Sequence, residues 1–355
     1  MTNKTKNMKG MVQTVLGLKN PAEIGITLTH EHLLIDLTCY FRMPDEATAR
    51  AIIDKPITIE MLGTLRKHFY ASRDAQTMFD EQLAIEEILK YKYAGGQSIV
   101  DTTSIGIARD PLALARISRA TGLNIIMGGS YYVIDSHPED MSFRTEESIT
   151  EHIIKDVTIG VGETGIKTGV IGEIGNYYPI GENETKILRA SAQAQAATGA
   201  PILIHPGIHP DSPSQILKVL TDNGASANNI IFGHLDNIRP MSAIKELGDS
   251  GCYLEYDRFG AEDTSFEYES GEVSTTSVSD AQRLESLEYL ISEGLGGQIT
   301  MAHDVCLKPE TVKYVGRGFA HILESIIPRM IRRGISQEQI EAMLIDNPAQ
   351  ALQFK

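Results

Sequence analysis

The feature that most constrains the fold is a series of short, β-branched apolar runs that alternate with longer segments of helical periodicity. Eight short buried strands, most of them followed by a helix, in one chain of this length predict an α/β fold of the (β/α)8 TIM-barrel type rather than a doubly wound sheet. The predicted strands are residues 26–35, 97–103, 123–133, 168–174, 201–207, 229–234, 252–257 and 298–304. The predicted helices are residues 111–121, 184–198, 212–222, 241–248 and 279–293, with one more after Val315.

The chain is expected to form one domain over residues 1–355, because a chain of this length can bury a large core and shows no internal repeat. The longest interruption lies between the first two predicted strands, at about residues 40–95. Its later part, 76–93, has apolar residues at helical spacing, which predicts a helical insert. Two interpretations stay open: a lid that controls substrate access, or helices that only pack on the outside of the barrel.

The charge balance and the cysteine content narrow the class of protein. Asp and Glu outnumber Lys and Arg by 47 to 32, which is opposite to the basic surface that nucleic acids and anionic membranes require. No stretch approaches the ~20 consecutive apolar residues of a membrane-spanning helix. Three scattered cysteines favour a reducing compartment. We therefore expect a cytoplasmic protein without nucleic-acid or membrane partners.

Four histidines and an aspartate stand near the ends of predicted strands, where barrel enzymes place their chemistry. His30 and His32 are separated by one residue, so both side chains face the same side of an extended strand. An isolated pair of this kind is often two core histidines, but His205, His234 and Asp304 stand at the ends of three further strands. Imidazole and carboxylate ligands suit zinc or a neighbouring first-row ion, and an open coordination position would activate water.

Glu173 is the only carboxylate in the apolar, glycine-flanked run 169–175 on the fourth predicted strand. A buried carboxylate is costly to ionise unless a cation compensates its charge. We therefore predict that Glu173 bridges two divalent ions, with a buried ion pair to arginine or lysine as the alternative. Asp304 is predicted to bind a metal and to relay the proton during hydrolysis. Its neighbour His303 is expected to point the other way.

Six short motifs, spread over nearly the whole chain, are residues 12–17 (VQTVLG), 29–32 (THEH), 172–175 (GEIG), 204–207 (IHPG), 254–257 (LEYD) and 302–304 (AHD). They resemble the phosphotriesterase family of the amidohydrolase superfamily, and within it the branch of phosphotriesterase-related proteins. The resemblance implies a barrel with a binuclear centre, usually zinc. The ligands that it implies are His30, His32 and Asp304 for the deeper ion, His205 and His234 for the more exposed ion, and Glu173 for both.

One residue departs from part of this family. Members that hydrolyse organophosphates and lactones use a carboxylated lysine on the fourth strand as the bridge, whereas here Glu173 stands in that register. Glutamate already carries two oxygens, but its shorter side chain requires a closer approach of the backbone or the metals. The flanking glycines permit that approach. Organophosphate hydrolysis is therefore kept only as an alternative function.

The predicted function is hydrolysis of a carbonyl substrate by a hydroxide held between two divalent ions, for which we expect Zn²⁺. An ester, a lactone or the amide of an N-acyl amino acid would serve, and some relatives in this branch are similar to amidases of N-acetyltaurine. Arg258 follows the seventh strand and would bind an anionic group, unless it only pairs with Glu262 or another acid. Tyr132 and Tyr178 are predicted to line the pocket, with a place in the core as the alternative.

Two further expectations concern assembly and activity. Homodimers are common in the family, so a homodimer is one expected assembly. The alternative to an enzyme is a metal-containing protein that binds a small molecule without turning it over. Such a protein would saturate with its ligand and release no product.

Overall fold

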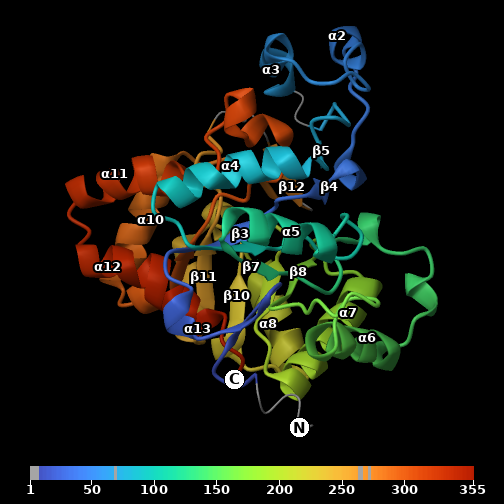
Figure 1. Ribbon diagram of the computed structural model, residues 1–355, viewed down its shortest axis with the longest axis vertical. Helices are drawn as coiled ribbons and strands as arrows, with labels where there is room; N and C mark the ends of the chain where they lie inside the picture. The colour runs from blue at the N-terminus through green and yellow to red at the C-terminus, as the bar shows by residue number, and fades with distance from the viewer. Residues whose placement is uncertain (1–7, 68–69, 263–266, 271–272) are drawn as a thin grey trace.

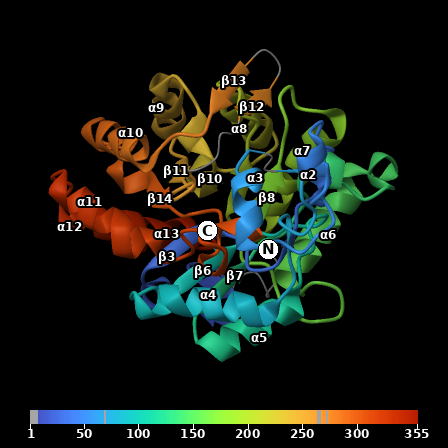
Figure 2. The ribbon, with the colours of Figure 1, turned by 90° about the horizontal axis from the view of Figure 1, so that it is seen from above.

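The computed structural model describes residues 8–67, 70–262, 267–270 and 273–355, and it confirms the predicted barrel. Eight parallel strands surround one axis, with helices on the outside (Figure 1, Figure 2). The strands are β3 (Thr27–Glu31), β6 (Ser98–Asp101), β7 (Asn124–Met127), β8 (Ile171–Gly175), β9 (Ile202–His205), β10 (Ile230–Phe232), β11 (Tyr253–Tyr256) and β14 (Ile299–Met301). The helices that follow them are α4 (Glu81–Tyr93), α5 (Pro111–Thr121), α6 (Glu146–Thr158), α7 (Glu182–Thr198), α8 (Ser212–Asp222), α9 (Met241–Asp249), α10 (Asp280–Ser292) and α11 (Ile327–Arg332), and the chain ends with α12 (Gln337–Glu341) and α13 (Asn347–Ala351).

Backbone hydrogen bonds close the ring of strands. The strands form two parallel ladders, β3–β6–β7 and β8–β9–β10–β11–β14. At one junction the N–H of Gly169, just before β8, donates to the carbonyl of Met127 on β7 at 2.8 Å. At the other junction the N–H of Asp304, after β14, donates to the carbonyl of His30 on β3 at 3.1 Å. Two predicted metal ligands therefore lie on the seam that closes the barrel.

Alternation along the strands divides the apolar core in two. One set of side chains faces the surrounding helices, and a second, separate cluster fills the barrel axis. Each fully buried aliphatic side chain contributes about 1.5–3 kcal/mol. The axial cluster consists of Val12, Ile24, Val100, Ile126, Val170, Leu203, Ile231, Tyr253, Ala351 and Leu352. Because this cluster fills the interior, polar side chains converge at the C-terminal ends of the strands.

Two irregularities in the ladders turn polar side chains into the barrel. β3 shifts register between residues 28 and 31, and β8 shifts between residues 171 and 174. Leu28 and Ile171 belong to the core cluster that packs against the helices. Unbroken alternation would therefore turn His30 and Glu173, two residues further on, to the same outer side. The extra residue at each bulge turns these two side chains toward the barrel axis instead.

The first and third predicted strands are longer than the observed ones, and one observed helix was not predicted. The short antiparallel pairs β1–β2 (Val12–Thr14 with Gly17–Lys19) and β12–β13 (Glu267–Ser270 with Val273–Thr276) lie outside the predicted strands. The third strand ends at Met127 rather than at residue 133, because two glycines follow it and Ser130 has a left-handed backbone with φ of 63°. Helix α6 was not predicted, although Thr145 caps it by accepting the N–H of Ser148 at 3.2 Å. The other predicted strands and helices overlap the observed ones.

The two parts of the predicted insert, residues 40–95, lie at different positions on the barrel. Helix α4 packs beside α5 on the outside of the barrel, where Tyr91 donates a hydrogen bond to the carbonyl of Ile26 at 2.8 Å. The earlier part rises above the strand ends as α2 (Ala47–Arg50) and α3 (Leu62–Leu65) (Figure 1). At its base, β4 (Ile35–Asp36) pairs with β5 (Thr77–Met78), and this pair packs in a cluster with Tyr132 and Leu307. The position of the earlier part suits a lid, which stays a prediction.

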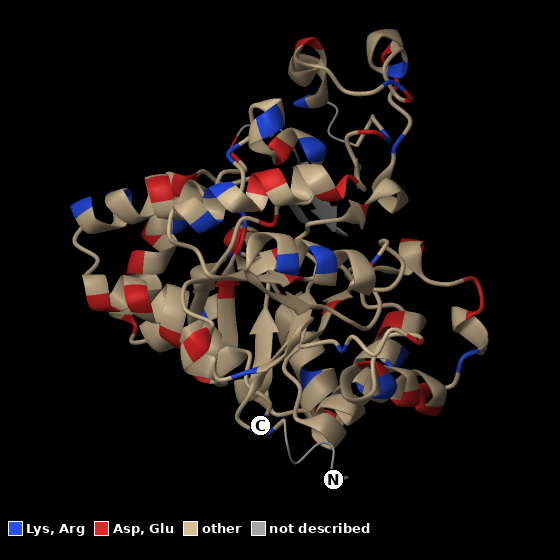
Figure 3. Ribbon diagram, viewed as in Figure 1, with Lys and Arg blue, Asp and Glu red and all other residues tan. Residues whose placement is uncertain are grey.

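The outer surface carries charges of both signs. Figure 3 shows Lys and Arg interspersed with Asp and Glu along the outer helices, so no basic face is seen among the described residues in that view. Within the described part of the chain, none of the helices has the length and apolar character needed to cross a membrane.

A buried network of charges supports the turn after β11. Arg283 of α10 donates from Nε to Oδ1 of Asp236 at 2.6 Å and from Nη1 to Oδ1 of Asp280 at 3.1 Å. The other oxygen of Asp236 accepts the backbone N–H of Asp257 at 3.0 Å. All three charged side chains of the network are fully buried. The network therefore links an outer helix to the end of a barrel strand.

Replacing Arg283 by methionine should lower the free energy of unfolding by about 3–5 kcal/mol, because the buried carboxylate of Asp236 loses its cation and that of Asp280 loses one of its partners. Urea denaturation followed by circular dichroism measures the change. Arg333→Met is the matched control: Arg333 pairs with Glu288 at the surface, and its loss should cost about 1 kcal/mol or less. Equal losses in the two variants would contradict a structural role for the buried network.

Candidate metal centre

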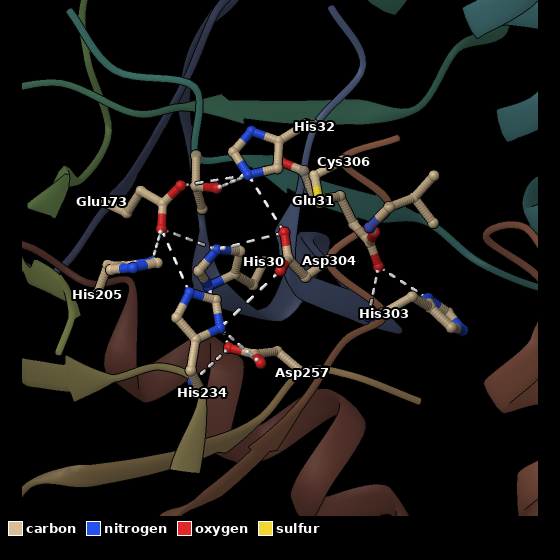
Figure 4. Close-up of polar contacts among 12 residues, drawn as sticks. His30, Glu31, His32, Glu173, His205, His234, Asp257, His303, Asp304 and Cys306 are labelled. Atoms are coloured by element: carbon tan, nitrogen blue, oxygen red, sulfur yellow. Dashed lines mark hydrogen bonds and ion pairs between the residues drawn. The ribbon is translucent and has the colours of Figure 1, made fainter. Parts of the chain in front are cut away.

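The six predicted metal ligands lie in one cluster at the C-terminal ends of the strands (Figure 4). Glu173 is at its centre and is only 1% exposed. Oε2 of this carboxylate lies 3.3 Å from Nε2 of His30, 3.2 Å from Nδ1 of His205 and 3.5 Å from Nε2 of His234. Oε1 lies 3.3 Å from Nε2 of His32. These residues come from four different strands, so the closed barrel is what assembles them.

Asp304 joins the cluster from the turn after β14. Its Oδ1 lies 3.3 Å from Nε2 of His32 and 3.9 Å from Nε2 of His30, while its Oδ2 accepts a hydrogen bond from Arg258 at 2.7 Å. Asp304 and His234 have left-handed backbones, with φ of 49° and 56°. Such a conformation costs of order 1–3 kcal/mol in a residue other than glycine and is concentrated at functional sites. One oxygen of Asp304 thus faces the imidazoles and the other is held by a cation.

Two carboxylates behind the cluster hold two of the histidines. Nδ1 of His30 is hydrogen-bonded to Oε2 of Glu255 at 2.9 Å, and Nδ1 of His234 to Oδ1 of Asp257 at 2.9 Å. Each ring therefore has its outer nitrogen fixed and presents Nε2 to Glu173. Sequence reasoning assigned no role to Glu255 or Asp257. Their spacing of two residues at the end of β11, which puts both on the same face of extended chain, is the signal that could have found them.

Three buried polar atoms of the cluster make no hydrogen bond to any of the residues that the structure describes. They are Nε2 of His30, Nε2 of His234 and Oε2 of Glu173. An unsatisfied buried donor or acceptor costs about 1–3 kcal/mol, and here three of them converge on one space. Imidazole nitrogens and carboxylate oxygens in this arrangement are the ligands of a divalent ion such as zinc. The residues present therefore fit the ions that the family resemblance implies.

The electrostatic field of the cluster favours a positive charge on His30 and disfavours one on His205. Burial opposes protonation of His30, but the carboxylates of Glu173 and Asp257 raise its pKa well above the usual value. At His205, burial lowers the pKa, and the neighbouring His234 lowers it further. Burial opposes ionisation of Glu173, yet the surrounding imidazoles, His30 first, hold its pKa well below the usual value. The same carboxylates that raise the pKa of His30 would attract a metal cation.

Arg258 is buried beside Asp304 rather than exposed in a loop. Its side chain donates from Nη1 to Oδ2 of Asp304 at 2.7 Å and from Nη2 to Oε1 of Glu310 at 3.0 Å. Glu262, the partner considered from the sequence, instead pairs with Arg317 at 3.1 Å. Arg258 therefore supports the position of Asp304, and its contact with a substrate anion stays a prediction.

The two tyrosines predicted to line the pocket take different positions. The hydroxyl of Tyr132 lies 3.3 Å from Nδ1 of His205, the ring nitrogen that also faces the central carboxylate. Tyr178 stacks on His209, with ring centroids 3.8 Å apart. Tyr132 is thus in direct contact with a predicted metal ligand, whereas Tyr178 forms an aromatic pair with a neighbouring loop. A role in substrate binding stays a prediction for both.

His303 lies outside the cluster, as its alternation with Asp304 predicts (Figure 4). Its Nδ1 is 2.7 Å from Oε1 of Glu31, and its Nε2 accepts the backbone N–H of Ile322 at 3.0 Å. Glu31, which stands between the two histidines of the first strand, therefore faces the opposite side from both of them.

A barrel whose strand ends gather four imidazoles and two carboxylates defines a metal-dependent hydrolase as the class of protein. The sequence matches the Phosphotriesterase family over residues 10–352, and the chain belongs to this family. It is 40% identical to an N-acetyltaurine hydrolase from Tetraodon nigroviridis over 351 residues. This alignment covers 98% of this chain and 99% of the relative.

Two solved structures are similar over nearly the whole chain. A resiniferatoxin-binding protein from Rhodobacter sphaeroides superposes with a TM-score of 0.91 at 30% identity, covering 97% of this chain and 95% of the other. A variant of a PTE-like lactonase from Deinococcus radiodurans has a TM-score of 0.75 at 27% identity, covering 96% and 99%. The family expected from the six sequence motifs is thus confirmed.

Removing divalent ions should lower the melting temperature, because the cluster gains its missing partners only when ions are bound. At a free ion concentration 100-fold above the dissociation constant, binding contributes about 2.7 kcal/mol. Differential scanning calorimetry after chelation, and again after addition of Zn²⁺, measures the effect. In Glu173→Ala the difference between the two scans should shrink. Identical scans of the parent chain with and without zinc would show that the cluster does not bind it.

Proposed function

We propose that this chain hydrolyses the amide bond of a small N-acylated acid of the N-acetyltaurine type, using two divalent ions, most simply Zn²⁺. The observation that carries the proposal is the convergence of unpaired imidazole nitrogens on the buried carboxylate of Glu173. It is supported by the relative of 40% identity that is named an N-acetyltaurine hydrolase. Ester and lactone hydrolysis need the same activation of a carbonyl group and remain within the proposal.

The proposed ligands are His30, His32 and Asp304 for the deeper ion, His205 and His234 for the more exposed ion, and Glu173 for both. When bound, the ions supply a Lewis acid for the carbonyl oxygen and lower the pKa of water from 15.7 to about 7. The protein's part is to fix the positions of these donors. The outer nitrogens of His30 and His234 are already held by carboxylates, so little rearrangement is needed on binding.

Asp304 is proposed to move the proton. Burial opposes its ionisation, but Arg258 and His32 hold its pKa below the usual range, so it is a carboxylate at neutral pH. A carboxylate here can accept a proton from the attacking water and deliver it to the amine nitrogen as the C–N bond breaks. Arg258 holds Oδ2 at 2.7 Å, which leaves Oδ1 directed at the imidazoles.

Arg258, Tyr132 and Tyr178 are the proposed substrate contacts. Arg258 is the positive group nearest Asp304, and Tyr132 brings a hydroxyl to within 3.3 Å of His205. Arg258 would attract the acid group of the substrate, and the tyrosines would line its path. A cytoplasmic location and a homodimer, both expected from the sequence, also remain proposals.

One comparison favours a second candidate function. The similar structure from Rhodobacter sphaeroides is named a resiniferatoxin-binding protein. A protein that binds a small molecule at the barrel mouth without turning it over is therefore kept as the alternative. Product release separates the two candidates, because a binding protein saturates and releases nothing.

The substrate class is tested with one panel of compounds on zinc-reconstituted protein. The panel contains N-acetyltaurine, other N-acyl amino acids, aryl esters, phosphorylated sugar lactones and a phosphotriester. We expect the N-acyl acids to be hydrolysed with the highest kcat/KM, and chelation to abolish the activity. Preference for the phosphotriester would overturn the reasoning from Glu173. Binding without product release across the panel would favour the second candidate.

Asp304→Asn should lower kcat by about 10²–10⁴-fold on every substrate, because an amide cannot relay the proton. Stopped-flow or steady-state kinetics measure the loss, and elemental analysis of the same sample shows whether both ions remain bound. Asp249→Asn is the control, since Asp249 pairs with Lys245 on the surface of α9. A variant at position 304 that keeps near-parental kcat with both ions bound would refute the proton-transfer role.

A further inference from the structure

We propose that two buried carboxylates at the C-terminal end of β11 each control the affinity of a different one of the two ions. Glu255 sets the affinity of the ion at His30, and Asp257 sets the affinity of the ion at His234. Both acids act through a histidine and are positioning residues. The inference rests on the proposed two-ion site, but it concerns the acids that lie behind the predicted ligands.

The side chain of Glu255 is hydrogen-bonded to His30. It lies on β11, is fully buried, and its Oε2 is hydrogen-bonded to Nδ1 of His30 at 2.9 Å. Its other oxygen accepts a hydrogen bond from Thr300 at 3.4 Å, which holds the carboxylate in place. A ring nitrogen carries at most one proton and so makes one strong hydrogen bond, and for Nδ1 of His30 the partner is Glu255.

Both carboxylate oxygens of Asp257 are hydrogen-bonded to His234. Oδ1 is hydrogen-bonded to Nδ1 of the ring at 2.9 Å, and Oδ2 accepts the backbone N–H of the same residue at 2.8 Å. Oδ2 also lies 3.3 Å from Nδ1 of His30, which is farther than the Glu255 oxygen. The backbone N–H of Asp257 donates to Asp236, so the buried network behind the strand fixes this residue.

Since Glu255 and Asp257 contact different histidines, their removal should change the affinities of different ions. A carboxylate hydrogen-bonded to the outer nitrogen of a metal-bound histidine fixes the ring and raises its basicity. Loss of such a partner typically weakens metal affinity by about 10–100-fold. Because each acid makes its shortest contact with a different imidazole, and the two imidazoles belong to different ions, removal of each acid should weaken one ion more than the other.

Zinc titration of the apoprotein against a chromophoric chelator tests this proposal without any substrate. Glu255→Gln and Asp257→Asn are each placed in two backgrounds. His205→Ala leaves the ligands of the deeper ion, and His32→Ala leaves those of the more exposed ion. With His205→Ala, the change at Glu255 should weaken zinc binding about 10–100-fold. The change at Asp257, whose Oδ2 lies 3.3 Å from Nδ1 of His30, should weaken it less. With His32→Ala, the two effects should be reversed.

The control separates this role from a general loss of stability. Asp156→Asn removes a buried carboxylate that pairs with Arg109 at 2.8 Å, outside both the cluster and the Arg283 network, and it should leave zinc affinity unchanged. If Glu255→Gln does not fold, Glu255→Asp is the second variant, because it withdraws the oxygen from His30 and should show the same selective loss.

Two results would overturn the proposal: equal weakening of both ions by both changes, or no weakening by either. Failure of the parent chain to bind zinc is a different result, because it would refute the proposed function itself. The two failures are thus distinguishable in one titration.

Discussion

The buried charge of Glu173 is the constraint on which the rest of this structure depends. The carboxylate is almost fully enclosed, and four imidazoles from three other strands surround it at 3.2–3.5 Å. The backbone must come close to make this possible. Gly172 has φ of 139°, and a Cβ there would lie 2.1 Å from the carbonyl oxygen of Leu203, so β8 can approach β9 only with glycine at this position. The bulge in β8 then turns the carboxylate into the barrel.

The surroundings of the cluster determine its chemistry. Carboxylates hold the outer nitrogens of His30 and His234, so the inner nitrogens are directed at one space before any cation arrives. The two oxygens of Asp304 also have different surroundings: Arg258 holds Oδ2, and Oδ1 faces the imidazoles. Because these side chains already hold their positions, little reorganisation energy is needed when ions and substrate bind. Such preorganisation strengthens electrostatic catalysis. The barrel supplies the rigidity, and the loops above the strand ends supply the choice of substrate.

Much of the fold and of the candidate site could be predicted from sequence, and the remainder depended on tertiary contacts. The eight strands were predictable because each is a short apolar run, and the six clustered residues because they stand where those runs end. The bulges at residues 28–31 and 171–174 were not predictable, because register is set by pairing between strands. Arg258 was expected near a substrate anion, and its pairing with Asp304 and Glu310 emerges only when distant loops meet. Helix α6 was missed although its cap and apolar spacing were present in the sequence.

The proposed role of Glu173 as a bridge between two metal ions can be observed directly. X-ray diffraction from zinc-loaded crystals, recorded at the zinc absorption edge, tests it most directly. If Glu173 bridges two ions, we expect two anomalous peaks about 3.5–4 Å apart, one on each side of its carboxylate. A single peak held by other residues, or two peaks that both lie away from Glu173, would contradict it.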